Sequence, residues 1–99
     1  MKIFNYEVKE ANTLSKRFFG LMGKKEANYG LLFKKCNGIH TFFMRFPLDI
    51  LFIKDKKIVY VKRNVKPWKI VVCKISGVDA IEIPYNIKND YKKDLVFYN

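Results

Sequence analysis

One hexapeptide, Leu48–Ile53 with the sequence LDILFI, constrains the fold of this 99-residue chain more than any other segment. In an extended strand, alternate side chains point to opposite faces, so Asp49 shares a face with Leu51 and Ile53. The remaining three residues share the other face, so both faces are apolar apart from one carboxylate. This arrangement predicts that Asp49 is at least partly buried, and a buried carboxylate must be paired, hydrogen-bonded or protonated.

Other short runs of alternating or β-branched apolar residues indicate further strands. A strand is expected at the amino terminus, over residues 2–9. Seven more are expected over residues 30–33, 39–44, 48–53, 58–61, 70–75, 78–84 and 95–98. Asn37-Gly38 favours a tight reversal, Pro47 breaks the strand ladder, and residues 55–57 close the clearest hairpin.

Residues 13–22 are the segment with helical spacing. Thr13 is a suitable N-cap, apolar residues follow at Leu14, Phe18 and Leu21, and Gly23 suits a C-terminal stop. One substantial helix in the N-terminal half, followed by about seven short strands, predicts an α+β fold with a mainly antiparallel sheet. Such a sheet could curl into a distorted barrel to protect its edges. The length and the hydrophobic content of 49% predict one domain, 1–99.

The formal net charge of +11 suggests three kinds of partner: nucleic acid, an anionic membrane face or an acidic protein. Only three of the 20 basic residues are arginines, and no run of lysines exceeds two. Because arginine is the residue preferred for bidentate phosphate and base contacts, this composition argues against specific nucleic-acid binding.

The chain also lacks several features that would place it in other classes. No apolar stretch approaches the roughly 20 residues that span a bilayer, and the first ten residues carry charges where a signal peptide would be apolar. Cys36 and Cys73 match neither a disulfide framework nor a metal-ligand spacing. We therefore expect a cytoplasmic protein with reduced thiols, no metal and no cofactor.

Five motifs occur in one order along the chain: RFFGLM at 17–22, GLLF at 30–33, HTFFMRFPLDILF at 40–52, PW at 67–68 and IEIP at 81–84. Together they resemble the uncharacterised prokaryotic family called domain of unknown function 192, and FFMRFPLDI is the most specific block. The resemblance runs from about Thr13 onward. It implies a small, mainly β domain with a helix and supplies almost no biochemistry. After residue 84 the chain is shorter than the family pattern and lacks its glycine turns.

Asp49 and His40 are the candidate catalytic residues, since an imidazole oriented by a carboxylate can act as a general base. The alternative is structural. Asp49 would then cap the break at Pro47 or pair with Arg45 or Arg17, because structural ion pairs also gather around buried carboxylates.

Candidate binding residues lie in the same neighbourhood. Arg17 and Arg45 could grip an anionic ligand through their planar guanidinium groups, and Thr41 lies beside His40. Trp68, between Pro67 and a lysine, is either an exposed anchor for a partner or a lid folded onto the barrel end. The other aromatic residues of the 42–52 region could line a ligand pocket, and in a protein this small they are expected in the core.

Three functions remain open. The leading hypothesis is a non-catalytic accessory or binding module whose partner is a protein or an anionic ligand. The second is a small acid–base or hydrolase-like enzyme that uses His40 and Asp49. The third is weak nucleic-acid binding through the basic surface. A binding module should present an exposed aromatic patch, whereas the enzyme needs His40 and Asp49 within hydrogen-bond reach beside a pocket.

Overall fold

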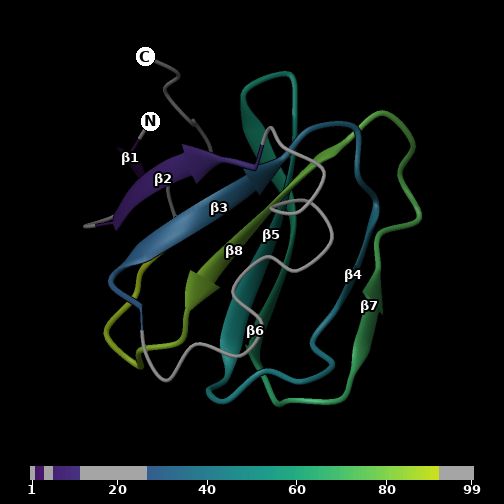
Figure 1. The fold of residues 1–99 in the computed structure, drawn as a ribbon. Helices are drawn as coiled ribbons and strands as arrows, with labels where there is room; N and C mark the ends of the chain where they lie inside the picture. The colour runs from purple at the N-terminus through teal and green to yellow at the C-terminus, as the bar shows by residue number, and fades with distance from the viewer. Residues whose placement is uncertain (1, 4–5, 12–26, 92–99) are drawn as a thin grey trace.

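The computed structural model describes residues 2–3, 6–11 and 27–91, and within them eight strands form two sheets (Figure 1). The larger sheet has the order β1-β2-β3-β8-β5-β6, and the smaller pairs β4 with β7. The strands are β1 (Lys2–Ile3), β2 (Tyr6–Glu10), β3 (Tyr29–Phe33), β4 (Gly38–His40), β5 (Leu48–Lys54), β6 (Lys57–Val65), β7 (Ile70–Val72) and β8 (Asp79–Pro84).

The predicted α+β class with a curled antiparallel sheet is wrong. The described ranges contain no helix, so none there could span a bilayer, and strands supply their regular structure. The larger sheet is mixed, because β2 runs parallel to β3, and open, because β1 and β6 end it. The long connection between β2 and β3 permits the crossover that a parallel pair needs. The helix expected at 13–22 lies outside the described residues.

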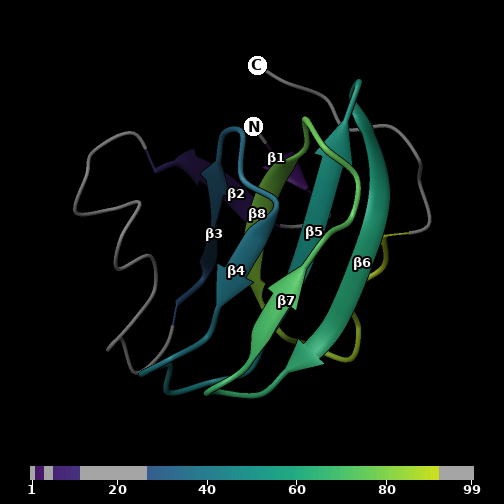
Figure 2. The same cartoon turned by 90° about the vertical axis from the view of Figure 1, so that its right-hand side faces the viewer.

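Strand β5 lies between β8 and β6, and every residue from Leu48 to Ile53 is buried. Its residues Leu48, Ile50 and Phe52 join a cluster that includes Ile39 of β4 and Val71 of β7. Leu51 and Ile53 join a second cluster on the opposite face of the sheet. Figure 2 shows the β4–β7 pair as a second layer in front of β5. The prediction that both faces of Leu48–Ile53 are apolar and buried is therefore confirmed, because each face packs in its own apolar cluster.

The strands with the clearest patterns are confirmed, and three others differ from the prediction in extent. The strand expected over 70–75 ends at Val72. Residues 2–9 form two strands, β1 and β2, that pair antiparallel with Ile3 opposite Tyr6. Residues 39–44 are a strand only as far as His40, because the backbone of Thr41 bonds instead to the loop after β6. The terminal strand expected at 95–98 lies outside the described part of the chain.

The predicted β5–β6 hairpin is confirmed and is longer than its apolar pattern. Its two-residue loop, Asp55-Lys56, has positive φ at both positions, 54° and 62°, and joins the pair Lys54 and Lys57. Two successive left-handed residues are the geometry of a type I′ turn, whose twist matches that of the flanking strands. The turn fixes where the β5–β6 ladder begins.

Candidate functional site

Asp49 lies opposite a bulge in β6. Leu48 pairs with Val65 and Ile50 pairs with Lys62, so two residues of β6 oppose the single residue Asp49. The second bulge residue, Asn64, has a positive φ of 53°, and its backbone N–H donates to Asp49 Oδ1 at 3.0 Å. The carboxylate therefore caps an irregularity of the neighbouring strand rather than the break at Pro47.

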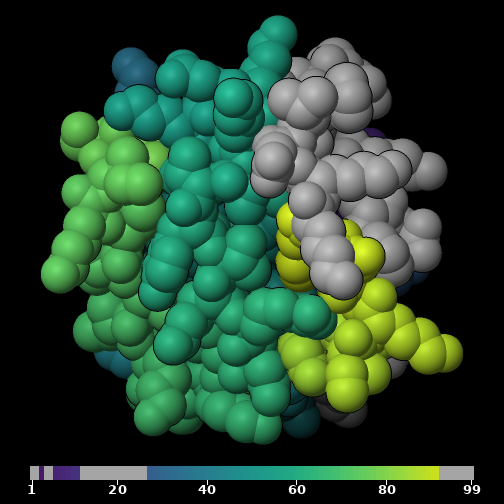
Figure 3. All heavy atoms as spheres, turned by 180° about the vertical axis from the view of Figure 1, so that it is seen from behind, coloured from purple at the N-terminus to yellow at the C-terminus, as the bar shows by residue number. Residues whose placement is uncertain are grey.

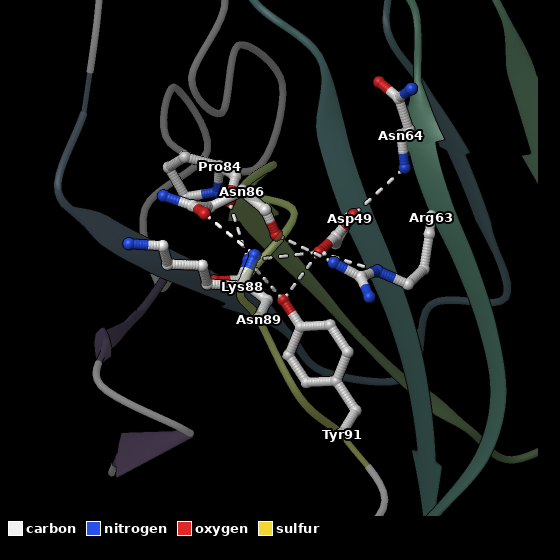
Figure 4. Close-up of polar contacts among 8 residues, drawn as sticks. All are labelled: Asp49, Arg63, Asn64, Pro84, Asn86, Lys88, Asn89 and Tyr91. Carbon is white, nitrogen blue, oxygen red and sulfur yellow. Dashed lines mark hydrogen bonds and ion pairs between the residues drawn. The ribbon is translucent and has the colours of Figure 1, made fainter.

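The second carboxylate oxygen accepts further bonds (Figure 4). Asp49 Oδ2 accepts from the Tyr91 hydroxyl at 2.8 Å and from Asn89 Nδ2 at 3.1 Å, and it lies 3.4 Å from Arg63 Nε. Asn89 Nδ2 also lies 3.2 Å from the carbonyl oxygen of Pro84 and 2.8 Å from the Tyr91 hydroxyl. Asp49 is 0% exposed, so these donors replace the water that a charged carboxylate would otherwise bind.

Arg63 lies between the buried Asp49 carboxylate and solvent, and its side chain is 38% exposed. Its Nη2 donates to the carbonyl oxygen of Asn86 at 2.8 Å. Its guanidinium carbon lies 5.6 Å from the ring centre of Tyr85 and 5.4 Å from that of Tyr91. Positively charged groups are attracted to ring faces at this distance. We call Asp49, Arg63, Asn64, Asn89 and Tyr91 the Asp49 cluster.

The Asp49 cluster changes the ionisation of one member. Burial of the Tyr91 hydroxyl, and then its hydrogen bond to Asp49, raise the pKa of Tyr91 far above its ordinary value of 10.0. The neutral phenol is thus the form that the folded protein stabilises, because only that form can donate to the carboxylate.

Stability should therefore fall in alkaline solution. Above about pH 10 the unfolded chain ionises Tyr91 while the folded protein holds the proton, so the free energy of unfolding decreases as the pH rises. The decrease should be smaller than the ~1.4 kcal/mol per pH unit of a fully protected group, because Tyr91 is only partly buried. Urea unfolding between pH 9 and pH 11 measures it. The Tyr91→Phe variant should lose this part of the pH dependence, whereas Tyr85→Phe should keep it; equal profiles for both variants would refute the assignment.

His40 is not among the partners of Asp49. It is exposed at the end of β4, its Nδ1 accepts a hydrogen bond from the backbone N–H of Phe42 at 3.2 Å, and its ring stacks on the Phe42 ring at 5.0 Å. The two candidate catalytic residues belong to different sheets, and the structure does not bring them together.

Thr41, in contrast, is buried and organises the loop between β6 and β7. Its hydroxyl donates to the carbonyl oxygen of Lys66 at 2.7 Å and accepts from the backbone N–H of Lys69 at 2.8 Å. Its own carbonyl oxygen accepts from the N–H of Trp68 at 2.9 Å. One side chain and its peptide groups therefore fix the path of the loop that carries Trp68.

Trp68 and Phe43 form an exposed aromatic group at this end of the molecule. Phe43 is 60% exposed and Trp68 is 58% exposed, and their ring centres lie 4.6 Å apart. The half-buried Phe42 ring lies 5.7 Å from Trp68 and continues the stack to His40. We call these four residues the aromatic tip. Trp68 is an exposed residue rather than a folded-back lid, and Phe43 is not in the core.

The remaining candidates do not join either group. Arg45 is exposed and is not a partner of Asp49, and Arg17 lies outside the described residues. In the part of the chain that the structure describes, no three His, Cys, Asp or Glu side chains gather as a metal ion would require. Of the predicted site residues, Asp49 thus belongs to the Asp49 cluster, and His40 and Trp68 belong to the aromatic tip.

Sequence reasoning missed Asn89 and Tyr91 as partners of Asp49. Both follow residue 84, where the chain departs from the pattern of the resembled family and no motif marks them. Arg63 could have been found, since it is one of only three arginines and lies on the strand paired with β5.

Comparison with known proteins gives the family. The DUF192 profile, described as uncharacterized ACR, matches residues 2–92. The chain belongs to the DUF192 family. A UPF0127 protein of Thermococcus sibiricus is 34% identical over 92 residues, which cover 87% of this chain and 60% of that relative. A UPF0127 protein of Pyrococcus horikoshii is 34% identical over 94 residues, which cover 89% of this chain and 81% of that relative.

The fold of this DUF192 domain also resembles a solved structure. A protein of unknown function from Novosphingobium aromaticivorans superposes with a TM-score of 0.71 at 20% identity, over 83% of this chain and 65% of that chain. The matched part of this chain spans less than two thirds of the Novosphingobium aromaticivorans protein and less than two thirds of the Thermococcus sibiricus relative. The likeness establishes the fold alone.

Proposed function

We propose that this DUF192 domain is a non-catalytic binding module that docks a partner protein on the aromatic tip. The observation that carries the proposal is the pair Phe43 and Trp68, two large aromatic side chains exposed side by side on left-handed backbone. Their φ values are 62° and 67°. This conformation costs a non-glycine residue roughly 1 kcal/mol or more, and such strain gathers at binding sites.

The surroundings of the tip support a binding role. The buried Thr41 holds the Trp68 loop in one conformation, so little conformational entropy would be lost when a partner binds. Exposed basic residues lie within two positions of Phe43 or Trp68 in the sequence, at Arg45, Lys66 and Lys69. Tryptophan is the residue that most often anchors protein interfaces, and a basic rim steers acidic partners towards it.

The catalytic alternative has less support. It requires an imidazole beside the carboxylate, whereas His40 stacks on Phe42 and bonds to its backbone. Both oxygens of Asp49 are occupied by donors from β6 and from the 85–91 segment, and the residue is fully buried. A carboxylate in these surroundings fits an anchor of the fold better than a general acid or base.

Selection of linear peptides on the parent protein tests the proposal, with the double variant Phe43→Asn/Trp68→Asn as the counter-target. Asparagine tolerates left-handed backbone, so the double variant should be as stable as the parent or more stable. The selected peptides, labelled with a dye, should bind it about tenfold more weakly or worse in fluorescence anisotropy. Equal binding to both proteins, or no peptide specific for the parent, would contradict a binding role for the tip.

A further inference from the structure

Strands β6 and β7 belong to different sheets, and residues of both line one hollow. Among the described strands, β6 ends the larger sheet and β7 pairs only with β4. Both strands begin or end at the loop that carries Trp68, and in Figure 2 they diverge as they leave it. An edge strand presents backbone N–H and C=O groups that can pair with another chain.

A hollow of about 320 Å³ lies between the two segments. Five of its six lining residues are apolar or aromatic: Val59 and Tyr60 from β6, and Val72, Cys73 and Ile75 from β7 and the residues after it; Lys74 is the sixth. We call it the β6–β7 groove. Figure 3 shows the green segment that contains β7 alongside the teal strands. Its volume lies at the lower end of the range for ligand sites.

The charged residues of the segment that contains the groove lining have one sign. Residues 56–78 contain seven lysines and arginines and neither an aspartate nor a glutamate. Arg63 is held by Asp49, which comes from β5, and the six lysines are all exposed. The carboxylates of a ligand bound along residues 56–78 would therefore be attracted by the lysines, and no acidic residue of that segment would repel them.

We propose that the β6–β7 groove binds an extended acidic segment of a partner protein. The segment adds as a strand along the edge of β6 that no other described strand pairs with, places its apolar side chains in the hollow and turns its carboxylates to the lysines. This mode of binding uses backbone hydrogen bonds for affinity and alternate side chains for specificity. The inference rests on the proposed binding role and specifies the partner.

An extended peptide fits these observations better than nucleic acid does. Three of the six residues that line the hollow are aliphatic, and in the 56–78 segment the one arginine is already bonded to Asp49 and Asn86. Phosphate recognition relies on arginine forks, whereas strand addition needs an open edge and an apolar surface that accepts every second side chain.

The test uses a dye-labelled peptide of alternating glutamate and valine and measures fluorescence anisotropy with the full chain. We expect saturable binding below about 1 mM. Ile75→Glu, in the groove, should weaken it about tenfold or more, whereas Ile87→Glu should leave it unchanged. Ile87 is a matched control, because the substitution is identical and the side chain is 79% exposed on the 85–91 segment. N-methylation of alternate peptide amides should also weaken binding, since it removes ladder hydrogen bonds.

Four results would overturn the inference: no saturable binding, equal binding of a peptide with lysine in place of glutamate, equal effects of the two isoleucine substitutions, or displacement of the peptide by single-stranded DNA of equal charge. The aromatic tip is tested separately by the double variant Phe43→Asn/Trp68→Asn. If the double variant no longer binds the parent-selected peptides and the parent does not bind the acidic peptide, peptide binding in the β6–β7 groove is refuted. The proposed binding at the aromatic tip is then still supported.

Discussion

Replacing Asp49 with asparagine should lower the free energy of unfolding by about 3 kcal/mol or more. Both carboxylate oxygens face donors: the backbone N–H of Asn64, and then Asn89, Tyr91 and Arg63. An asparagine amide keeps one oxygen and turns the other into an NH₂ group. Whichever way the amide is placed, a donor meets a donor at a buried position, and the guanidinium of Arg63 loses its counterion.

Urea unfolding followed by circular dichroism measures this loss, with Asp55→Asn as the matched control. Asp55 is exposed in the β5–β6 turn with a positive φ that asparagine accepts, so its substitution should change stability by no more than about 0.5 kcal/mol. If Asp49→Asn were as stable as the parent, the carboxylate would be held at a cost to the fold, as functional groups often are, and its structural role would be refuted.

Replacing Gly30 with alanine should cost about 2 to 3 kcal/mol, at the upper end of the usual penalty for overpacking. Gly30 lies in β3 between β2 and β8. A Cβ atom there would lie 2.9 Å from the carbonyl oxygen of Glu82, 3.1 Å from a side-chain carbon of Ile83 and 3.3 Å from one of Val8. The first contact is with a backbone atom inside a paired sheet, so relief requires the strands to separate.

Gly38→Ala is the control for that substitution. Gly38 also lies in a strand, but a Cβ atom there would meet nothing closer than 3.9 Å. Alanine should be neutral or slightly stabilising at this position, because it reduces the entropy of the unfolded chain. Thermal and urea unfolding of both variants would separate the two cases. Similar stability of Gly30→Ala and Gly38→Ala would show that β2, β3 and β8 are not as closely packed as described.

The parts of the fold that could be predicted are those fixed by local pattern. The apolar faces of Leu48–Ile53 placed β5 in the core, and the polar residues before Ile58 located the hairpin turn. The parallel pairing of β2 with β3 could not be read in this way, because alternation is the same in parallel and antiparallel strands. It depends on the long connection between them.

Other predictions were wrong because they depend on interactions between residues far apart in the sequence. The run 39–44 has the composition of a strand, yet β4 ends at His40 because Thr41 bonds to residues 66–69. Phe43 was expected in the core and lies on the surface with a positive φ. Left-handed backbone at a phenylalanine leaves no local signal, since the sequence reports such positions only when glycine, asparagine or aspartate occupies them.

In the candidate site, too, local pattern predicted one feature, and contacts between residues far apart in sequence determined the others. Burial of Asp49 could be predicted from its neighbours, but its partners could not. The turn at Asp55-Lys56 sets a register that, continued without interruption, would place Lys62 opposite Asp49. Two bulges shift the ladder so that Arg63 and Asn64 take that position instead. Asn89 lies 40 residues beyond Asp49, in a segment without a recognisable pattern.

Asp49 stabilises the fold, whereas the aromatic tip binds the partner. One measurement tests this difference most directly. The peptides selected on the parent should be titrated against Asp49→Asn and against Phe43→Asn/Trp68→Asn, under conditions where circular dichroism shows both variants folded. We predict that Asp49→Asn binds them within about twofold of the parent and that the double variant binds about tenfold more weakly or worse. Loss of binding by Asp49→Asn, with full affinity in the double variant, would contradict the claim and return the functional site to the buried carboxylate.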